Sequence, residues 1–262
     1  MIEIRCCSGL DELQACVELQ IETWGYDDSE LIPRKAFLVA QMIGGQVLGA
    51  FDTSISDLPN KMVGFAMSLP GVKNSPDGKA QPYLHSHMLA VREEYRDRGL
   101  GAELKRAQRV EALSRGIRLM EWTFDPLEIK NAFLNIHKLG AIARRYLVNF
   151  YGVSSSRLQG GLPTDRLVAE WWLDSPRVKG ILDAGQAVSQ VKRNAVECIK
   201  VPAAIYEWKN SEENRERAQA VQMENRGKFE DAFSRGLAVT GFQRDQDGNG
   251  IFELGALAEI GD

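Results

Sequence analysis

The sequence predicts an α/β fold in which a mixed central sheet is flanked by helices and followed by a C-terminal α+β extension. Three observations lead to this prediction. Strand-like and helix-like patterns of apolar residues alternate along residues 1–174. One apolar strand runs into a glycine-rich turn that opens an amphipathic helix. A chain of 262 residues also exceeds the usual size of one domain, which leaves room for an extension.

The first half of the chain carries strand and helix signals in turn. Ser8 resembles the first residue of a capping box, and helical spacing then continues to Trp24, with Gly25 as the stop signal. Pro33 can open a second helix, which a following pair of glycines ends. The remaining expected elements are strands at 2–6, 46–51, 62–69, 83–91 and 119–124, a turn-rich insert at 70–82, and a helix at 99–115.

The second half begins with an expected helix at 128–139 that ends at Gly140, followed by strands at 142–151 and 167–173. A fresh helix start at 174–176 places a domain boundary between residues 174 and 175. We expect the extension, 175–262, to pack against the core, to cover the acceptor side or to form a homodimer contact. Its expected elements are a helix at 176–186, a strand at 196–205, a long helix at 208–235 and a hairpin at 238–244 and 251–257.

The composition is that of an ordinary globular protein and excludes several classes. Hydrophobic residues make up 44% and charged residues 26%, which excludes collagen-like, disordered and coiled-coil chains. The net charge of −4 argues against nucleic-acid binding, because a phosphate backbone requires a cationic face. The uncharged stretch 36–51 is too short for a membrane span. With no secretory signal and four cysteines in no metal or disulfide pattern, we expect a cytoplasmic protein without membrane contact or bound metal.

The most informative segment is the strand at 83–91 and the turn that follows it. After a charged bend, the pattern R-x-x-G-x-G at 96–101 leads into the helix. Glycines let the backbone approach a ligand closely, and a helix N-terminus offers unpaired N–H groups and a positive dipole end. We therefore expect this turn to hold a pyrophosphate, with Arg96 and Arg98 adding charge-assisted contacts.

This motif, Arg96-Asp97-Arg98-Gly99-Leu100-Gly101, resembles the Q/R-x-x-G-x-G/A acyl-CoA loop of the GNAT N-acyltransferases. The order of elements over residues 1–174 is also similar to that fold. The resemblance implies acetyl-CoA, or another acyl-CoA such as succinyl-CoA, as the cofactor. It further implies that backbone N–H groups hold the pyrophosphate and that a strand edge pairs with the pantetheine arm. The implied cofactor-binding residues are Leu89, Ala90, Val91, Arg96, Asp97, Arg98, Gly99, Leu100, Gly101, Ala102 and Asn131.

Two of the three histidines lie in the strand that precedes this loop. Period-two alternation places His85 and His87 on one face, together with Leu89 and Val91. An amine attacks a thioester only as a neutral nucleophile, and the pKa of histidine suits removal of its proton near neutral pH. The spacing is similar to that in serotonin N-acetyltransferase, which implies that the pair passes the amine proton to solvent. The alternative is a pair of half-buried structural histidines.

The sequence departs from the family pattern at one position. The family often has a tyrosine four residues before the helix-ending glycine, as the acid for the departing thiolate, and this chain has Ile136 there. Tyr146 on the next strand is the candidate acid, with Tyr151 as a second choice, unless the thiolate leaves unassisted.

Charged residues around the motif leave further alternatives open. Asp125 either binds a cationic substrate group or caps the following helix, and we favour the cap. Lys105, Arg106 and Arg109 either reach the 3′-phosphate of CoA or, as we favour, form a solvated helix face.

These signals predict an acyl-CoA-dependent N-acyltransferase. It is expected to transfer an acyl group, acetyl by default, directly to the primary amine of a small molecule, with an amino acid as one candidate acceptor. The catalytic residues are His85 and His87 as proton acceptors and Tyr146 as the acid. The alternative is a CoA-binding or regulatory module without turnover, which Ile136 and the offset position of Asn131 favour.

Overall fold

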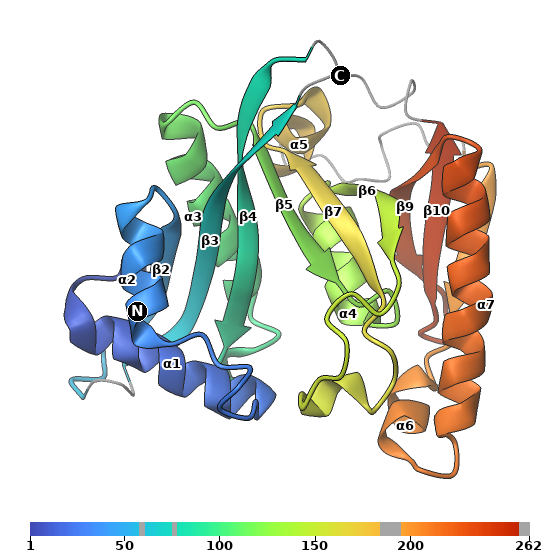
Figure 1. Cartoon of the computed structure of the whole chain (residues 1–262), viewed down its shortest axis with the longest axis horizontal. Helices are drawn as coiled ribbons and strands as arrows, with labels where there is room; N and C mark the ends of the chain where they lie inside the picture. The colour runs from blue at the N-terminus through green and yellow to red at the C-terminus, as the bar shows by residue number, and fades with distance from the viewer. Residues whose placement is uncertain (58–60, 75–77, 184–194, 257–262) are drawn as a thin grey trace. The chain divides into compact units, whose positions relative to one another are not determined.

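The computed structural model describes residues 1–57, 61–74, 78–183 and 195–256 (Figure 1). The chain divides into two compact units. Unit 1 comprises residues 1–121 and 155–157, and unit 2 comprises residues 122–154 and 158–262. Neither unit begins or ends at residue 174, and the domain boundary expected there stays a prediction. The expected mixed α/β architecture, with a sheet flanked by helices, is confirmed.

Unit 1 contains β1 to β4 and the first three residues of β5, in the strand order β1-β2-β3-β4-β5. The first four strands are antiparallel neighbours, and β5 pairs with β4 in parallel, through Leu84 with Met120 and His85 with Glu121. The strands are β1 (Ile2–Cys6), β2 (Gln46–Asp52), β3 (Met62–Asn74), β4 (Ala80–Val91) and β5 (Leu119–Phe124).

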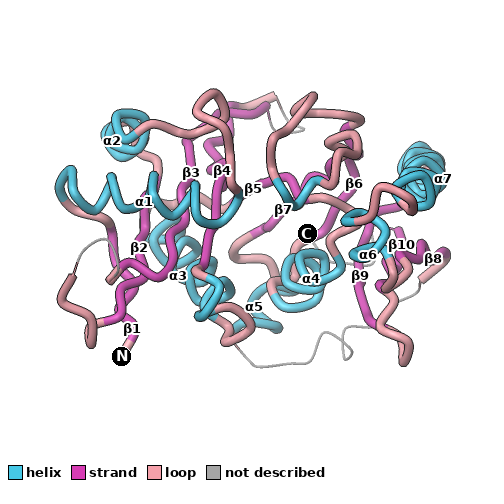
Figure 2. The backbone as a smooth tube through the Cα atoms, turned by 90° about the horizontal axis from the view of Figure 1, so that it is seen from below, coloured by secondary structure: helices cyan, strands magenta, loops and turns pink. Residues whose placement is uncertain are grey.

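Helices cover both faces of this sheet, as the view along the strands shows (Figure 2). α1 (Gly9–Trp24) and α2 (Arg34–Met42) lie on one face, and α3 (Leu100–Ser114) lies on the other. Each face has its own apolar core, because burial of apolar surface is the main driving force for packing helices on a sheet. The first core includes Leu13, Phe37, Phe65, Met88 and Ala90, and the second includes Val63, Ala66, Val91, Leu100 and Leu104.

The prediction of a turn-rich insert at 70–82 is wrong, because β3 and β4 continue through most of this segment as a hairpin. Their register runs from Gly64 opposite Val91 to Asn74 opposite Ala80. Pro70 suggested a loop because proline cannot donate to a strand ladder. However, β2 pairs with β3 only as far as Ser68, so beyond that residue one edge of β3 has no partner in the described sheet. A proline fits such an edge.

Unit 2 holds a second set of strands in the order β7-β6-β9-β10-β8. The long helix α7 packs against β6, β8 and β9. The strands are β6 (Ile142–Leu147), β7 (Arg166–Trp172), β8 (Glu197–Val201), β9 (Leu237–Arg244) and β10 (Gly250–Ala256). The helices are α4 (Ile129–Ala132), α5 (Pro176–Leu182), α6 (Ile205–Asn210) and α7 (Arg215–Ser234).

Two expected helices of unit 2 differ in detail. The helix at 208–235 is two helices, α6 and α7, because Ser211 adopts an extended backbone conformation. The helix at 128–139 begins as α4 and continues as a π-helix, Phe133–Lys138, which ends before Gly140 as expected. The expected helix start at Ser175 is confirmed, since its side chain accepts a hydrogen bond from the Val178 N–H. The predicted ends of that helix and of the last strand, residues 184–186 and 257, lie outside the described residues.

Among the helices of the described chain, none combines the length and the apolar character needed to cross a bilayer.

Two glycine substitutions should have opposite effects on stability. A Cβ at Gly45 would lie against the Ser68 carbonyl oxygen and 2.7 Å from that of Ala40, and backbone atoms cannot turn away. Gly45→Ala should therefore lower the free energy of unfolding by about 1–3 kcal/mol. A Cβ at Gly227, inside α7, meets nothing within 4 Å, so Gly227→Ala should raise it by up to about 1 kcal/mol. Urea unfolding measures both, and equal changes in the two variants would contradict this packing.

Candidate active site

A β-bulge in β4 organises the candidate site. The register of β3 and β4 shifts between Met67, which pairs with Met88, and Ser68, which pairs with Ser86. His87 is therefore the extra residue of the bulge. Such an insertion bends the strand and re-aims its side chains, and bulges are frequent next to active sites.

The bulge overturns one expectation about side-chain faces. Leu89 and Val91 pack in the α3-side core, whereas Met88 and Ala90 pack in the core under α1 and α2. Before the bulge, Ser86 contacts α3, so alternation places His85 on the α1 and α2 face. The prediction that Leu89 and Val91 share the histidines' face is wrong, because one inserted residue reverses the alternation. The two histidine rings do lie together, with their centroids 6.0 Å apart.

Burial keeps both imidazoles neutral at pH 7. His85 and His87 are each partly buried, and desolvation disfavours their charged forms. For His85, burial and then the neighbouring His87 lower the pKa to about 4. For His87, burial alone lowers the pKa. Two neutral rings side by side are able to accept a proton.

A buried polar contact lies behind the bulge, on the α3 side. Lys105 Nζ donates to Ser86 Oγ at 2.7 Å, and Ser86 Oγ donates to Gln108 Oε1 at 3.1 Å. Burial lowers the pKa of Lys105 well below its usual value. Lys105 is 4% exposed and Arg109 is 8% exposed, so the expected solvated helix face is wrong for both. Arg106, between them in sequence, is exposed.

The glycine-rich turn adopts the backbone that its sequence requires. Asp97 and Gly99 both have positive φ, 58° and 86°, and Gly99 directly precedes α3. The N–H groups of Ala102 and Glu103 already donate to the Gly99 carbonyl, at 2.9 and 3.1 Å. The turn is anchored to the strand because Arg96 Nε donates to the Val91 carbonyl at 2.9 Å. The side chains of 96–98 are exposed.

Unit 1 alone brings together the two histidines, the strand end at 89–91 and the loop at 96–102. The other two expected site residues lie in unit 2. Asn131 is exposed on α4. Tyr146 lies on β6 and donates its hydroxyl proton to buried Asp165 at 2.7 Å, and Asp165 is also paired with Arg226 at 2.9 Å. Burial, then Asp165, raises the pKa of Tyr146, so this geometry favours a positioning role over the expected acid.

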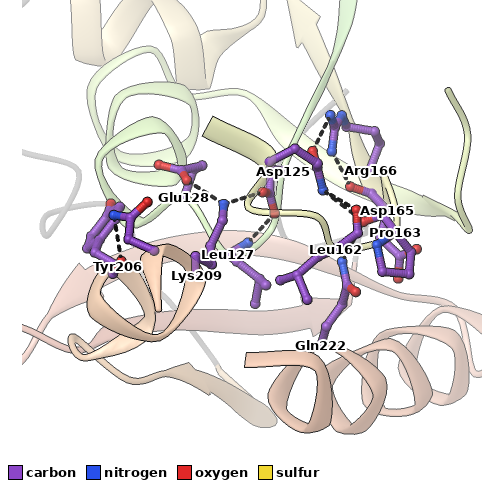
Figure 3. A network of polar contacts seen from close by, with 12 residues as sticks. Asp125, Leu127, Glu128, Leu162, Pro163, Asp165, Arg166, Tyr206, Lys209 and Gln222 are labelled. Atoms are coloured by element: carbon purple, nitrogen blue, oxygen red, sulfur yellow. Dashed lines mark hydrogen bonds and ion pairs between the residues drawn. The ribbon is translucent and has the colours of Figure 1, made fainter. Parts of the chain in front are cut away.

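Asp125 bridges a backbone turn and a buried cation, as Figure 3 shows. One carboxylate oxygen accepts the Leu127 N–H at 2.8 Å, and the other lies 3.0 Å from Lys209 Nζ. Glu128 holds the same ammonium group at 2.7 Å. Burial opposes the charge on Lys209, but Asp125 and Glu128 together raise its pKa. Asp125 thus accepts a hydrogen bond from the turn that precedes α4, as the favoured prediction of a helix cap anticipated. The cation that it pairs with is Lys209 of the same chain.

Glu121 and Asn135 are among the buried polar residues that the sequence analysis did not single out. Glu121 on β5 is 4% exposed, pairs in register with His85 and forms an ion pair with Lys73. An acidic residue inside an apolar strand was the signal, because carboxylates are seldom buried without a role or a partner. Asn135 in the π-helix is 2% exposed. Among the described residues, no group of three or more histidine, cysteine or acidic side chains could hold a metal ion.

Known proteins are similar to this chain in part of the sequence and in fold. Residues 13–135 match the sequence model of the acetyltransferase (GNAT) family. No curated protein matches the chain. Among solved structures, NAA60 from Arabidopsis thaliana in complex with acetyl-CoA superposes with a TM-score of 0.54 at 15% identity, over 66% of this chain and 98% of that one. The same protein with a bisubstrate analogue gives 0.50 at 18% identity, over 66% and 99%.

Residues 13–135 thus match the acetyltransferase (GNAT) family, and the resemblance that the motif at 96–101 indicated is confirmed over this part of the chain. This match supports the expected N-acetyltransferase, and the superposed plant structures show that the fold is shared with a protein solved in complex with acetyl-CoA. The closer likeness to serotonin N-acetyltransferase stays a prediction.

The described residues of unit 1 fit acetyl-CoA. Among them, β4 pairs with β5 at two positions, the last at His85, so the edge of residues 87–91 that faces away from β3 has no ladder partner in this part of the chain. Such an edge suits an extended pantetheine arm with amide groups. A Cβ built on Gly99 meets nothing within 4 Å, which leaves open space before the α3 N-terminus for a pyrophosphate.

The depressed histidine pKa values predict a pH-dependent stability. A histidine whose folded pKa lies below its unfolded value destabilises the fold when protonated, so the stability present above the unfolded pKa is lost as the pH falls. For His85 this loss should occur between pH 6.5 and about 4, and it should reach up to about 3 kcal/mol. Urea unfolding across this range measures it, with His85→Gln as the flatter comparison. A wild-type stability that is constant across the range would rule out the buried neutral state.

Proposed function

We propose that the chain is an N-acetyltransferase that acylates the primary amine of a small molecule by direct transfer from acetyl-CoA, with His85 and His87 as the proton acceptors. The observation that carries the proposal is the pair of neutral, adjacent imidazoles on β4, directly before the cofactor loop. A small amino acid is the candidate acceptor, and acetyl is the default acyl group, with succinyl as the variant to test.

The chain's own groups would act in a fixed order. Backbone N–H groups at 97–101 bind the pyrophosphate, since the first turn of α3 leaves donors without intrahelical partners. The β4 edge at 89–91 orients the pantetheine arm, and a backbone N–H near Leu89 or Ala90 faces the carbonyl oxygen. Acetyl-CoA, when bound, supplies the activated thioester. A nitrogen of His85 or His87, directly or through water, accepts the proton that the amine loses.

Tyr146 is left out of the proton transfer in this scheme, because its hydroxyl donates to Asp165. A thiol is a good leaving group, and the thiolate departs without a protein acid. Asn131 remains a proposed cofactor contact. A cytoplasmic location and a homodimer also belong to the proposal, and light scattering of the purified chain tests the dimer.

Removal of either histidine should slow acyl transfer. His85→Gln and His87→Gln should each lower kcat/KM by about 100-fold near neutral pH, because general-base catalysis contributes about 10²–10⁴-fold. The measurement is thiol release from acetyl-CoA and succinyl-CoA with a panel of amines and amino acids. His137→Gln is the matched control, since its imidazole stacks on Phe133 in unit 2.

Two outcomes would contradict the assignment. Wild-type rates in both variants at every pH would remove the histidines from the chemistry. Cofactor binding without thiol release across the whole panel would mean a non-catalytic binding module.

A strained loop should weaken cofactor binding specifically. Gly99 has φ 86°, so Gly99→Ala puts a side chain in a backbone region that costs about 1–2 kcal/mol and should raise the KM for acetyl-CoA by about 10-fold. Gly116→Ala, after the opposite end of α3, has φ 75° and equally open space, so it matches the strain without touching the loop. An equal rise of KM in both variants would contradict the loop assignment.

A further inference from the structure

An ion pair spans β4 beside His85. Lys73 comes from β3 and Glu121 comes from β5, the two strands that flank β4, and their charged groups form an ion pair. The Lys73 ammonium lies over the ring of Tyr83, 4.8 Å from its centroid. Tyr83 is two residues before His85 on the same face of β4. The pair therefore passes over β4 immediately next to the histidine.

Register also places Glu121 at His85. The two residues are partners in the parallel β4–β5 ladder, and laterally paired side chains of a sheet project from the same face. The carboxylate is nearly buried, with a side-chain exposure of 6%, while Lys73 is 29% exposed. A buried charge is screened little by solvent, so the Glu121 carboxylate favours the protonated form of its ladder partner, His85.

We propose that the Lys73–Glu121 pair is a positioning device that controls how readily His85 accepts a proton. The inference rests on the proposed function, in which His85 is a base. Glu121 favours the imidazolium form of His85, and Lys73 limits that effect by neutralising the carboxylate. Neither residue touches the reacting atoms, so both act through His85.

In the described part of the chain, other charged and titratable groups near His85 come from β4 and α3. On β4 they are His87 and Tyr83, and from α3 the neighbour is Lys105, across the sheet. From α1, Glu22 pairs with Arg92 at 3.4 Å and is thereby directed to the far end of β4. Burial and His87 are the largest causes of the low His85 pKa, Glu121 opposes them, and Lys105 and Lys73 add to them.

The two halves of the pair should have opposite effects, which a merely structural ion pair would not produce. Glu121→Gln removes the carboxylate, so the pKa of His85 should fall by about half to one pH unit. Lys73→Met leaves the carboxylate without its cation, so the pKa should rise by a similar amount. The measurement is a proton NMR titration of the histidine rings in the full chain. The sequence has three histidines, and His87→Gln and His137→Gln assign the signals.

Controls separate charge from folding. Lys73→Arg keeps the cation and should restore the wild-type titration. Lys228→Met breaks a surface pair within α7 and should change nothing at His85. Thermal unfolding checks that each variant is folded. Shifts of the same sign in Glu121→Gln and Lys73→Met, or no shift in either, would overturn the inference.

The pH profile of kcat/KM gives the second readout. Its acid limb should move with the NMR pKa of His85, to lower pH in Glu121→Gln and to higher pH in Lys73→Met. Opposite NMR shifts with an unmoved acid limb would mean that the pair tunes His85 but that His85 is not the base. In that case the proposed function fails, and the failure is distinct from failure of the electrostatic coupling.

Discussion

The architecture of unit 1 depends on one inserted residue in β4. A strand shows alternate residues to opposite faces, and a single insertion exchanges the faces for everything that follows. His87 is that insertion. Upstream of it, His85 faces the side of α1 and α2, and downstream of it, Leu89 and Val91 pack toward α3. One strand can therefore present two imidazoles on one side of the sheet and still anchor, on the other side, the helix that follows the glycine-rich turn.

The bulge is supported from behind by polar groups that are costly to bury. Lys105 is 4% exposed, so its ammonium group loses hydration, and this loss is what depresses the pKa of Lys105. The hydroxyl of Ser86 accepts a hydrogen bond from Lys105 Nζ and donates one to Gln108 Oε1. Such a chain fixes its members relative to one another, because a displaced member would leave a buried polar atom without a partner. Ser86 directly precedes His87, so the chain fixes the position where the alternation changes.

The sequence was sufficient for the elements whose signals are local. Glycine stops, the start at Ser175 and Pro176 and the loop at 96–101 depend on backbone preferences of a few residues, and each lies where it was expected. The predictions that were wrong concern features that depend on pairing between segments distant in the sequence. Whether Pro70 ends a strand is decided by where β2 stops, and the faces of Leu89 and Val91 are decided by a register shift against Met67. Lys105 looked solvated because the helix pattern does not reveal which charged residue packs under the sheet.

The part of the β3–β4 hairpin beyond Ser68 extends past the end of β2. In this arm, residues 69–74 of β3 pair with β4 and not with β2. The arm therefore contributes little to the apolar core. Lys73 lies on it. Core residues accept few substitutions, whereas a peripheral arm tolerates many. Exchange of residues on this arm, Lys73 among them, would therefore change the electrostatic surroundings of His85 without disturbing the apolar cores on the two faces of the sheet.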